Sequence, residues 1–200
     1  GSLYFDSRKS QSLTRTPASA SNRKTWTYSV WLKRTNIGSG AQSNHCAFFS
    51  ADSGSANDNQ RMHMFLGNAS DQIQHDLHSA SPRKSSSVFR DLTGWYHVVV
   101  RFDTLQAAAR DQIAWFINGE QILDWVTESA LTQDGDYGIN GQYLHRIGAN
   151  NAAGPGQFWD GRMSQAYMID GMALGPEYFG YTDPLTGVWR PKKFKAEGTT

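Results

Sequence analysis

A regular alternation of apolar and polar side chains is the feature that most limits what this chain can fold into. Between residues 25 and 33 every second side chain is large and apolar, and the intervening positions are polar except for Trp31. Successive side chains of a β-strand point to opposite faces of its sheet. The segment is therefore predicted to be a strand with one face in a core. That face consists of Trp26, Tyr28, Val30 and Leu32.

Similar short patterns recur along the chain and predict strands in preference to helices. The predicted strands are residues 46–51, 61–66, 73–78, 95–102, 113–117, 121–123, 144–148 and 162–169. Segments rich in Gly, Ser, Asn and Asp predict loops at residues 36–44, 52–60, 80–87 and 149–156. Asn118 and Gly119 both accept a positive φ, so they predict a tight hairpin within residues 113–123. A single helical turn is expected at residues 174–179.

Many short strands without helical crossovers must bury their apolar faces against a second sheet. The predicted fold class is therefore all-β, a two-sheet antiparallel jelly-roll sandwich. The chain of 200 residues, with 38% hydrophobic and 12% aromatic residues, suffices for one well-filled domain, which is predicted to span residues 1–180. Residues 181–200 contain Pro191 and a basic cluster, and they are predicted to form an extended strap or a linker to a following domain.

Charge and hydropathy exclude two classes of partner. The formal net charge is only +1, so no broad positive field is available to hold nucleic acid. The longest apolar runs are far shorter than the roughly 18–20 residues needed to cross a bilayer, so no membrane insertion is expected. Cys46 is the single cysteine, which rules out an internal disulfide, and we expect it to be a buried structural thiol.

Three segments combine aromatic and apolar residues in a recurring order. They read TYSVWLK at 27–33, WYHVVVRFD at 95–103 followed by WFINGE at 115–120, and FWDGRM at 158–163 followed by YMIDGMAL at 167–174. Their order and spacing resemble laminin G-like and concanavalin A-like (pentraxin-like) jelly-roll domains. In such a sandwich we expect Trp95, Tyr96 and Phe102 each to bury a large apolar area. Residues 3–21 and the tail DPLTGVWRPKK at 183–193 more narrowly resemble domains in virion structural proteins of marine bacteriophages.

The acidic residues do not suggest a catalytic pair. A glycoside hydrolase needs two carboxylates about 5 to 9 Å apart, whereas the acidic side chains of this chain mostly stand singly in predicted loops. Asp134 and Asp136 have a suitable spacing, but Gly135 between them predicts a turn. The chain is therefore predicted not to be an enzyme.

Metal sites are the next candidates. His75 and His78 point to opposite faces of a strand, so a zinc site would need further ligands from His45 or His63. Calcium prefers hard oxygen ligands, and related sandwiches often hold it at their rims. The predicted loop at 52–60 offers such ligands, although Asp and Asn are also ordinary turn residues. The candidate calcium ligands are Asp52, Asn57 and Asp58.

Sugar binding is a further hypothesis, based on aromatic residues in polar loops. Aromatic rings stack on the apolar faces of pyranoses, while Asn, Asp and backbone groups bind the hydroxyls. The candidate carbohydrate-binding residues are Trp125, Tyr137, Tyr143 and Trp159. Packing between loop and sheet is the alternative role for each. The basic pairs at residues 23–24 and 83–84 are expected to be solvated loop charges.

Taken with the resemblance, these observations predict a non-catalytic binding or assembly module of a bacteriophage virion protein, such as a tail fibre, spike or capsid decoration. Its expected partners are other virion proteins and a glycan of the host cell surface, at the outer surface of the particle. Homo-oligomerisation stays open, because no apolar heptad pattern indicates a particular symmetry. One alternative is a carbohydrate-binding module of a secreted or surface bacterial protein, and a second is a polysaccharide hydrolase or lyase.

Overall fold

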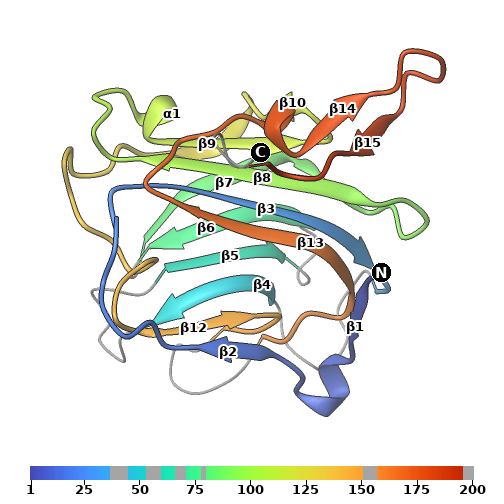
Figure 1. The fold of residues 1–200 in the computed structure, drawn as a ribbon, viewed down its shortest axis with the longest axis horizontal. Coiled ribbons are helices and arrows are strands. Elements are labelled where there is room, and N and C mark those ends of the chain that lie inside the picture. Colours follow the sequence, from blue (N-terminus) through green and yellow to red (C-terminus); the bar gives the residue numbers. More distant parts are fainter. Residues whose placement is uncertain (37–44, 53–59, 66–70, 78–79, 151–156, 196–200) are drawn as a thin grey trace.

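The computed structural model describes residues 1–36, 45–52, 60–65, 71–77, 80–150 and 157–195. Within these residues, two antiparallel β-sheets lie face to face (Figure 1). The predicted all-β sandwich is confirmed. The same residues contain no helix that is long and apolar enough to cross a membrane.

The first sheet contains most of the strands that the alternation predicted. Its strand order is β1-β13-β3-β8-β9-β10. Its members are β1 (Leu3–Phe5), β13 (Gly161–Asp170), β3 (Thr25–Arg34), β8 (Tyr96–Asp103), β9 (Ile113–Ile117) and β10 (Glu120–Gln121). The long strand β3 pairs with β13 on one side and with β8 on the other. It therefore forms the middle of the sheet.

The second sheet has the order β11-β7-β6-β5-β4-β12-β2. Its members are β11 (Trp125–Glu128), β7 (Ala80–Val88), β6 (Gln72–Leu77), β5 (Gln60–Phe65), β4 (His45–Asp52), β12 (Leu144–Ile147) and β2 (Leu13–Arg15). The short strand β2 occupies one edge and β11 the opposite edge. The segment from Ser21 to Lys24 carries the chain from β2 towards β3, and so links the two sheets.

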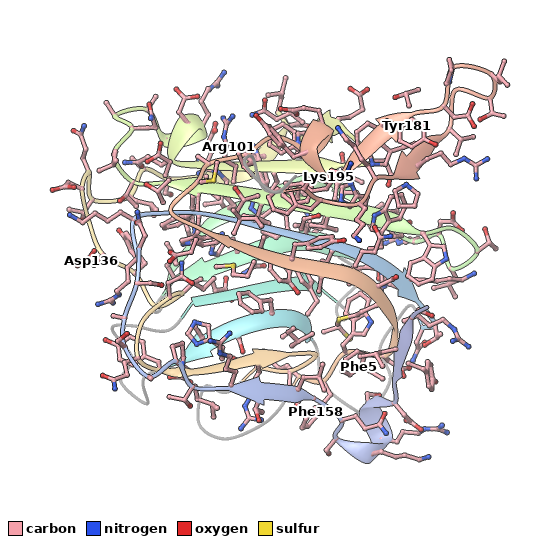
Figure 2. The ribbon with its side chains drawn as sticks, viewed as in Figure 1. Phe5, Arg101, Asp136, Phe158, Tyr181 and Lys195 are labelled. Carbon is pink, nitrogen blue, oxygen red and sulfur yellow. The ribbon has the colours of Figure 1, made fainter. Side chains whose placement is uncertain are left out.

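The core between the sheets follows the predicted pattern of β3. Trp26, Tyr28, Val30 and Leu32 are all buried and belong to one hydrophobic cluster. The ring of Trp26 stacks on that of Phe102 with centroids 4.6 Å apart. Cys46 is buried in the same cluster, as expected, and burial raises the pKa of its thiol to about 12. The side chains that fill this space are drawn in Figure 2, where Phe5, the last residue of β1, is labelled.

The prediction of a loop at residues 80–87 is wrong, because these residues form most of β7. Its polar residues Arg83 and Ser85 are buried, and their side chains form hydrogen bonds with backbone groups, so these positions do not follow an apolar alternation. The hydroxyl of Ser85 accepts a hydrogen bond from the Ile73 N–H and donates one to the Ser87 carbonyl. Arg83 was expected to be a solvated charge, but it is fully buried and donates to the Pro82 and Ser129 carbonyls.

The hairpin predicted at Asn118 and Gly119 is confirmed. The two residues have φ values of 50° and 88°, and they join β9 to β10. The Asn118 side chain also accepts a hydrogen bond from the His97 N–H at 2.8 Å. β10 is only two residues long, shorter than the predicted strand at 121–123. A short 3-10 turn at Pro176–Tyr178 takes the place of the helical turn expected there.

A second, smaller hydrophobic cluster covers the outer face of the first sheet. Val99, Ala114 and Phe116 project outward from β8 and β9 and pack against Leu174 and Phe179 from the chain that follows β13. Thr27 and Ser29 on the outward face of β3 are also fully buried, and the Thr27 hydroxyl donates a hydrogen bond to the Met172 carbonyl of the same covering segment. The backbone that follows β13 thus adds a third layer to the sandwich in this region.

The C-terminal segment belongs to this third layer. β14 (Gly180–Thr182) pairs with β15 (Trp189–Pro191) in a two-stranded hairpin that projects beyond the first sheet (Figure 1). Tyr181 lies on this hairpin (Figure 2). The ring of Phe194 stacks on that of Phe179 at 5.2 Å. Most of this hairpin lies within residues 181–200, and the strap or linker to a following domain stays a prediction.

Candidate functional site

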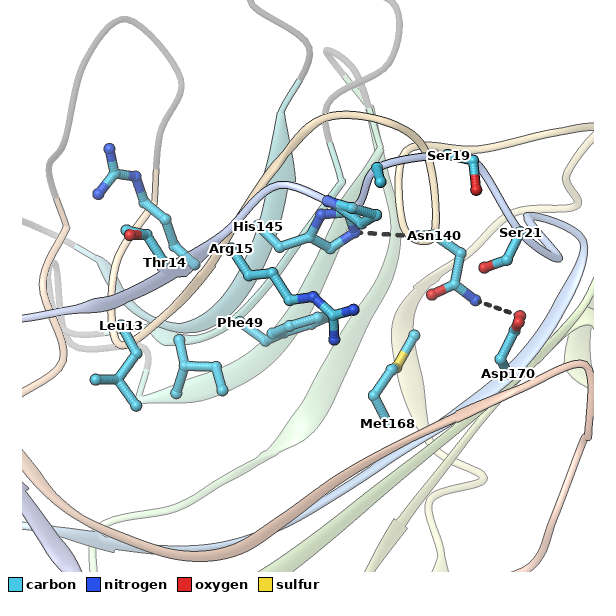
Figure 3. A pocket seen from close by; sticks show the side chains of 14 residues that line it. Leu13, Thr14, Arg15, Ser19, Ser21, Phe49, Asn140, His145, Met168 and Asp170 are labelled. Carbon is cyan, nitrogen blue, oxygen red and sulfur yellow. Dashed lines mark hydrogen bonds between the residues drawn. The ribbon is translucent and has the colours of Figure 1, made fainter.

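A cleft of about 550 Å³ opens at one edge of the sandwich. Its walls come from three segments that are distant in sequence, namely residues 13–21, residues 140–147 and the end of β13 (Figure 3). β1 pairs only with residues 161–163 of β13, so in the described residues the later part of that strand has no β1 partner. Met168 and Asp170 lie in this later part and face the cleft. We call this feature the edge cleft.

Asn140 ties the walls of the edge cleft together. Its side-chain amide donates hydrogen bonds to the Asn22 carbonyl at 2.8 Å and to Oδ1 of Asp170 at 3.0 Å. Its backbone N–H donates to Nε2 of His145 at 3.1 Å, and its carbonyl accepts from the Ser21 N–H. Asn140 has a φ of 65°, a left-handed conformation that Asn tolerates better than most residues. The rim of the cleft is thereby held in place before any ligand arrives.

His145 acts in this network as a neutral acceptor. Its Nδ1 lies 2.8 Å from the Tyr143 carbonyl, to which only a protonated Nδ1 can donate. Its Nε2 is then free to accept the Asn140 N–H. Burial lowers the pKa of His145, and the nearby Arg15 cation also lowers it, although the Tyr143 carbonyl opposes them. The ring is therefore neutral near pH 7.

The floor of the edge cleft is apolar. Phe49, Ile147 and Met168 line it, and the exposed side chain of Leu13 lies among the lining residues. The ring of Phe49 stacks on that of Tyr28 with centroids 4.3 Å apart, which connects the floor to the main core. Such a floor offers van der Waals contact to the carbon faces of a ligand.

Charged groups stand on opposite walls. Arg15 is exposed and projects into the edge cleft (Figure 3), where its guanidinium forms no ion pair with any carboxylate of the described residues. Asp170 accepts hydrogen bonds from the Asn22 N–H and the Asn140 amide, both through Oδ1. The cleft thus presents hydrogen-bond donors on one side and a carboxylate on the other, above an apolar floor.

Two of the predicted sugar-binding residues meet at Arg23, beside the edge cleft but outside its lining. The Arg23 guanidinium donates to the Tyr137 carbonyl at 2.6 Å and lies 5.4 Å from the centre of the Tyr143 ring. The Tyr137 ring packs edge-on against Phe102 at 5.6 Å. Both tyrosines are half-buried. Their role in sugar binding stays a prediction.

The other two predicted sugar-binding residues lie elsewhere. Trp125 lies on β11, at the edge of the second sheet opposite β2, and its indole N–H donates to the Ile122 carbonyl. Trp159 is only 1% exposed and packs edge-on against Phe48 in the core, so its ring has no outer face on which a sugar could stack. The structure does not bring the four candidates together.

The calcium prediction falls largely outside the described residues. Asp52 ends β4 and is buried, whereas Asn57 and Asp58 are not among the residues described. Among those that are, no group of three or more His, Cys, Asp or Glu side chains could hold a metal ion. His75, considered for zinc, is buried in the core beside Trp26 and Trp115.

Sequence reasoning missed the residues that build the edge cleft. Asn140 is followed by Gly141, a pair that signals a turn, and this was the one local sign available. Arg15, His145 and Asp170 lie more than 20 residues apart in sequence, and only strand pairing places them at one edge. A local sequence pattern cannot show that residues so far apart in sequence lie at the same edge of the sheet.

The family follows from a comparison with family models. Residues 7–177 match the model described as the concanavalin A-like lectin/glucanases superfamily. The chain belongs to this superfamily.

Solved structures agree with this fold. Domain 4 of an extracellular arabinanase of Geobacillus stearothermophilus, in complex with arabinotriose, has a TM-score of 0.54 at 15% identity, over 80% of this chain and 66% of that one. The sialidase of Trypanosoma rangeli, in complex with sialic acid, has a TM-score of 0.52 at 11% identity, over 78% of this chain and 22% of that one. At such identities the likeness establishes the fold alone. The search of curated proteins found no match.

Proposed function

We propose that this chain is a non-catalytic glycan-binding module and that the edge cleft holds the sugar. The observation that carries the proposal is the network around Asn140, which sets four hydrogen bonds at the rim of a cleft with an apolar floor. Sites that combine an apolar floor with a few firmly placed polar groups suit ligands with carbon faces and hydroxyl edges. Preorganised groups also lower the entropic cost of binding.

The two walls explain why a sugar suits the edge cleft. Each sugar hydroxyl can both donate and accept a hydrogen bond. Arg15 offers only donors, and the Asp170 carboxylate offers only acceptors. A ring lying over Phe49 and Met168 could therefore satisfy both walls at once. Domain 4 of the arabinanase, which has a similar fold, was solved in complex with arabinotriose, and this makes glycans the first ligands to test.

Binding without cleavage is part of the proposal. Among the described residues that line the edge cleft, Asp170 is the one carboxylate. Hydrolysis of a glycosidic bond would normally need a second carboxylate about 5 to 9 Å away. Incubation with polysaccharides should release no reducing sugar above the blank. Release that depends on Asp170, lost in Asp170→Asn, would contradict this part of the proposal.

The test of the proposed site begins with a glycan array, followed by calorimetry with the glycans retained. Arg15→Ala should weaken binding about tenfold or more, since a hydrogen bond to a charged group contributes about 1.5–3 kcal/mol. Arg15 is exposed on a short edge strand, so the melting temperature should hardly change. Arg162→Ala is the matched control, because Arg162 is an exposed arginine of β13 that lies outside the cleft lining. Failure of the array to retain any glycan, or an unchanged affinity of Arg15→Ala, would refute the assignment.

For the biological setting we propose a virion structural protein of a bacteriophage, with other virion proteins and a host-surface glycan as partners. This part rests on the resemblance of residues 3–21 and 183–193 to such proteins. Mass spectrometry of purified particles should detect the chain in fixed copy number. Its absence from particles, together with recovery from a bacterial culture supernatant, would favour a secreted carbohydrate-binding protein instead.

A further inference from the structure

Three tryptophans lie outside both hydrophobic clusters of the described residues. Trp31, Trp95 and Trp189 come from β3, from the residue before β8 and from β15, and none of them belongs to either cluster. Trp95 was expected to be buried in the sandwich but is only half-buried. All three border a groove of about 460 Å³ on the outer side of the first sheet. We call this feature the tryptophan groove.

Two of the three rings of the tryptophan groove, those of Trp31 and Trp189, contact His97. The imidazole stacks on Trp31 with centroids 4.8 Å apart and on Trp189 with centroids 6.0 Å apart. The Trp189 indole N–H also donates to Nδ1 of His97 at 2.8 Å. Trp31 is 9% exposed, and its indole N–H has no hydrogen-bond partner among the described residues. A buried hydrogen-bond donor without a partner is energetically unfavourable. This donor belongs to Trp31, whose side chain borders the groove.

A β-bulge supplies the polar edge of the groove. Ser164 pairs with Trp31 and Tyr167 with Ser29, so β13 has one extra residue between these pairs. Gln165 lies in the bulge with a φ of 48° and is exposed at the groove. The Ser164 hydroxyl donates to the Gly1 carbonyl and so presents its oxygen lone pairs as acceptors. The groove therefore combines flat apolar walls with donors and acceptors.

We propose that the tryptophan groove is a second glycan-binding site, separate from the edge cleft. The inference takes its ligand class from the proposed function. Indole faces suit the carbon faces of pyranoses, and the Gln165 amide both donates and accepts, as sugar hydroxyls do. A proline-rich peptide also suits aromatic grooves, but its proline residues carry only carbonyl acceptors. Such a peptide would leave the acceptors of Ser164 and Gln165 without donors.

A protein with two glycan-binding sites can bind one polysaccharide at two points. The edge cleft is lined by the end of β13 and the tryptophan groove by its bulge, so the same strand contributes to both. A glycan engaged at one site raises the effective concentration of its other parts near the second. Long glycan chains that reach both sites should therefore bind more tightly than short ones that reach only one.

The experiment titrates the ¹⁵N-labelled chain with cellotetraose, maltotetraose and a proline decapeptide, and it follows the indole N–H signals. We expect the signals of Trp31, Trp95 or Trp189 to shift with at least one tetrasaccharide. Gln165→Gly should weaken this binding at least fivefold, and glycine accepts the positive φ at that position, so the fold should be kept. Trp95→Ala should abolish it. Leu185→Ala is the control, because Leu185 is 93% exposed on the same hairpin and lies outside the groove lining.

The outcomes separate the two sites. If Arg15→Ala loses binding at the edge cleft while the indole shifts persist, both proposals stand. If Arg15→Ala has no effect but the indole signals still shift, the groove stands and the edge-cleft assignment fails. The groove proposal is overturned if neither tetrasaccharide moves these signals, if only the decapeptide moves them, or if Gln165→Gly and Trp95→Ala bind as the wild type does.

Discussion

His97 shows how one buried side chain couples two layers of the molecule. It lies on β8, its Nδ1 accepts the Trp189 indole N–H, and its Nε2 lies 2.9 Å from the Ser29 hydroxyl. Since Nδ1 accepts, the ring proton is on Nε2 and donates to Ser29. Burial lowers the pKa of His97 to about 4. A proton on Nδ1 would oppose the Trp189 N–H directly.

Because of His97, the free energy of unfolding should fall as the pH is lowered. The folded-state pKa of His97 lies below the usual value of about 6.5, so the unfolded chain binds the proton more readily. The contribution to stability is complete above about pH 6.5 and is lost as the pH falls towards 4. Urea unfolding at pH 7 and pH 4.5 should show a loss of about 2–3 kcal/mol that is missing in His97→Gln. Equal pH dependence in the two proteins would show that His97 does not titrate in this way.

Single residues also mark the limit of what the sequence predicts. The alternation in β3 assigns Trp26 to the core correctly, because burial of a large apolar side chain dominates its placement. Arg34 and Arg83 are buried although their type is usually exposed. Arg34 forms an ion pair with Asp71 at 2.8 Å, and Asp71 also pairs with Arg90. Such partners come from distant segments, so local patterns cannot anticipate them.

At the scale of elements, the Trp189 side chain joins the C-terminal hairpin to the first sheet. The Trp189 indole occupies the space over Gly119 and Gly180, where an added Cβ would approach it to 2.6 Å and 2.4 Å. These two glycines therefore leave room for the ring that joins β15 to the β9–β10 hairpin. The same ring stacks on His97.

Removal of this ring tests the attachment. Trp189→Ala should lower the free energy of unfolding by about 2–4 kcal/mol, somewhat less than for a fully buried tryptophan. Gly180→Ala should also destabilise the chain, since the new methyl group meets the indole. Leu185→Ala, at the exposed part of the hairpin, should change stability by less than about 0.5 kcal/mol. Chemical denaturation measures all three, and a Trp189→Ala protein as stable as Leu185→Ala would mean that the hairpin is not docked through Trp189.

Elements with clear periodicity or turn chemistry could be predicted from sequence, and others could not. The strands around Tyr28 and Val99 and the turn at Asn118 follow from local rules. β7 could not be predicted, because Arg83 and Ser85 on it form hydrogen bonds with backbone groups of other segments, namely the Ile113 and Ser129 carbonyls and the Ile73 N–H. The packing of the C-terminal hairpin depends on Trp189 meeting Gly119, which is 70 residues away, and no local window of the sequence reveals this contact.

At the scale of the whole molecule, the fold could be predicted while the candidate site could not. A sandwich follows from the number of alternating segments alone. The edge cleft depends on the shortness of β1 and on the position of β2, which are properties of strand pairing. Of the aromatic residues expected to bind sugar, Trp159 is buried in the core, while Tyr137 and Tyr143 contact Arg23 beside the cleft. The rim residues Arg15, Asn140 and Asp170 carry that role in our proposal.

The most direct measurement maps the backbone amide signals of the ¹⁵N-labelled chain during titration with the glycan that the array retains best. If the edge cleft binds the glycan, we expect the largest shifts at Arg15, Ser21, Asn140, His145 and Asp170. The dissociation constant from these shifts should equal that from calorimetry. Saturable shifts that avoid all of these residues would contradict the assignment of the edge cleft as the glycan site.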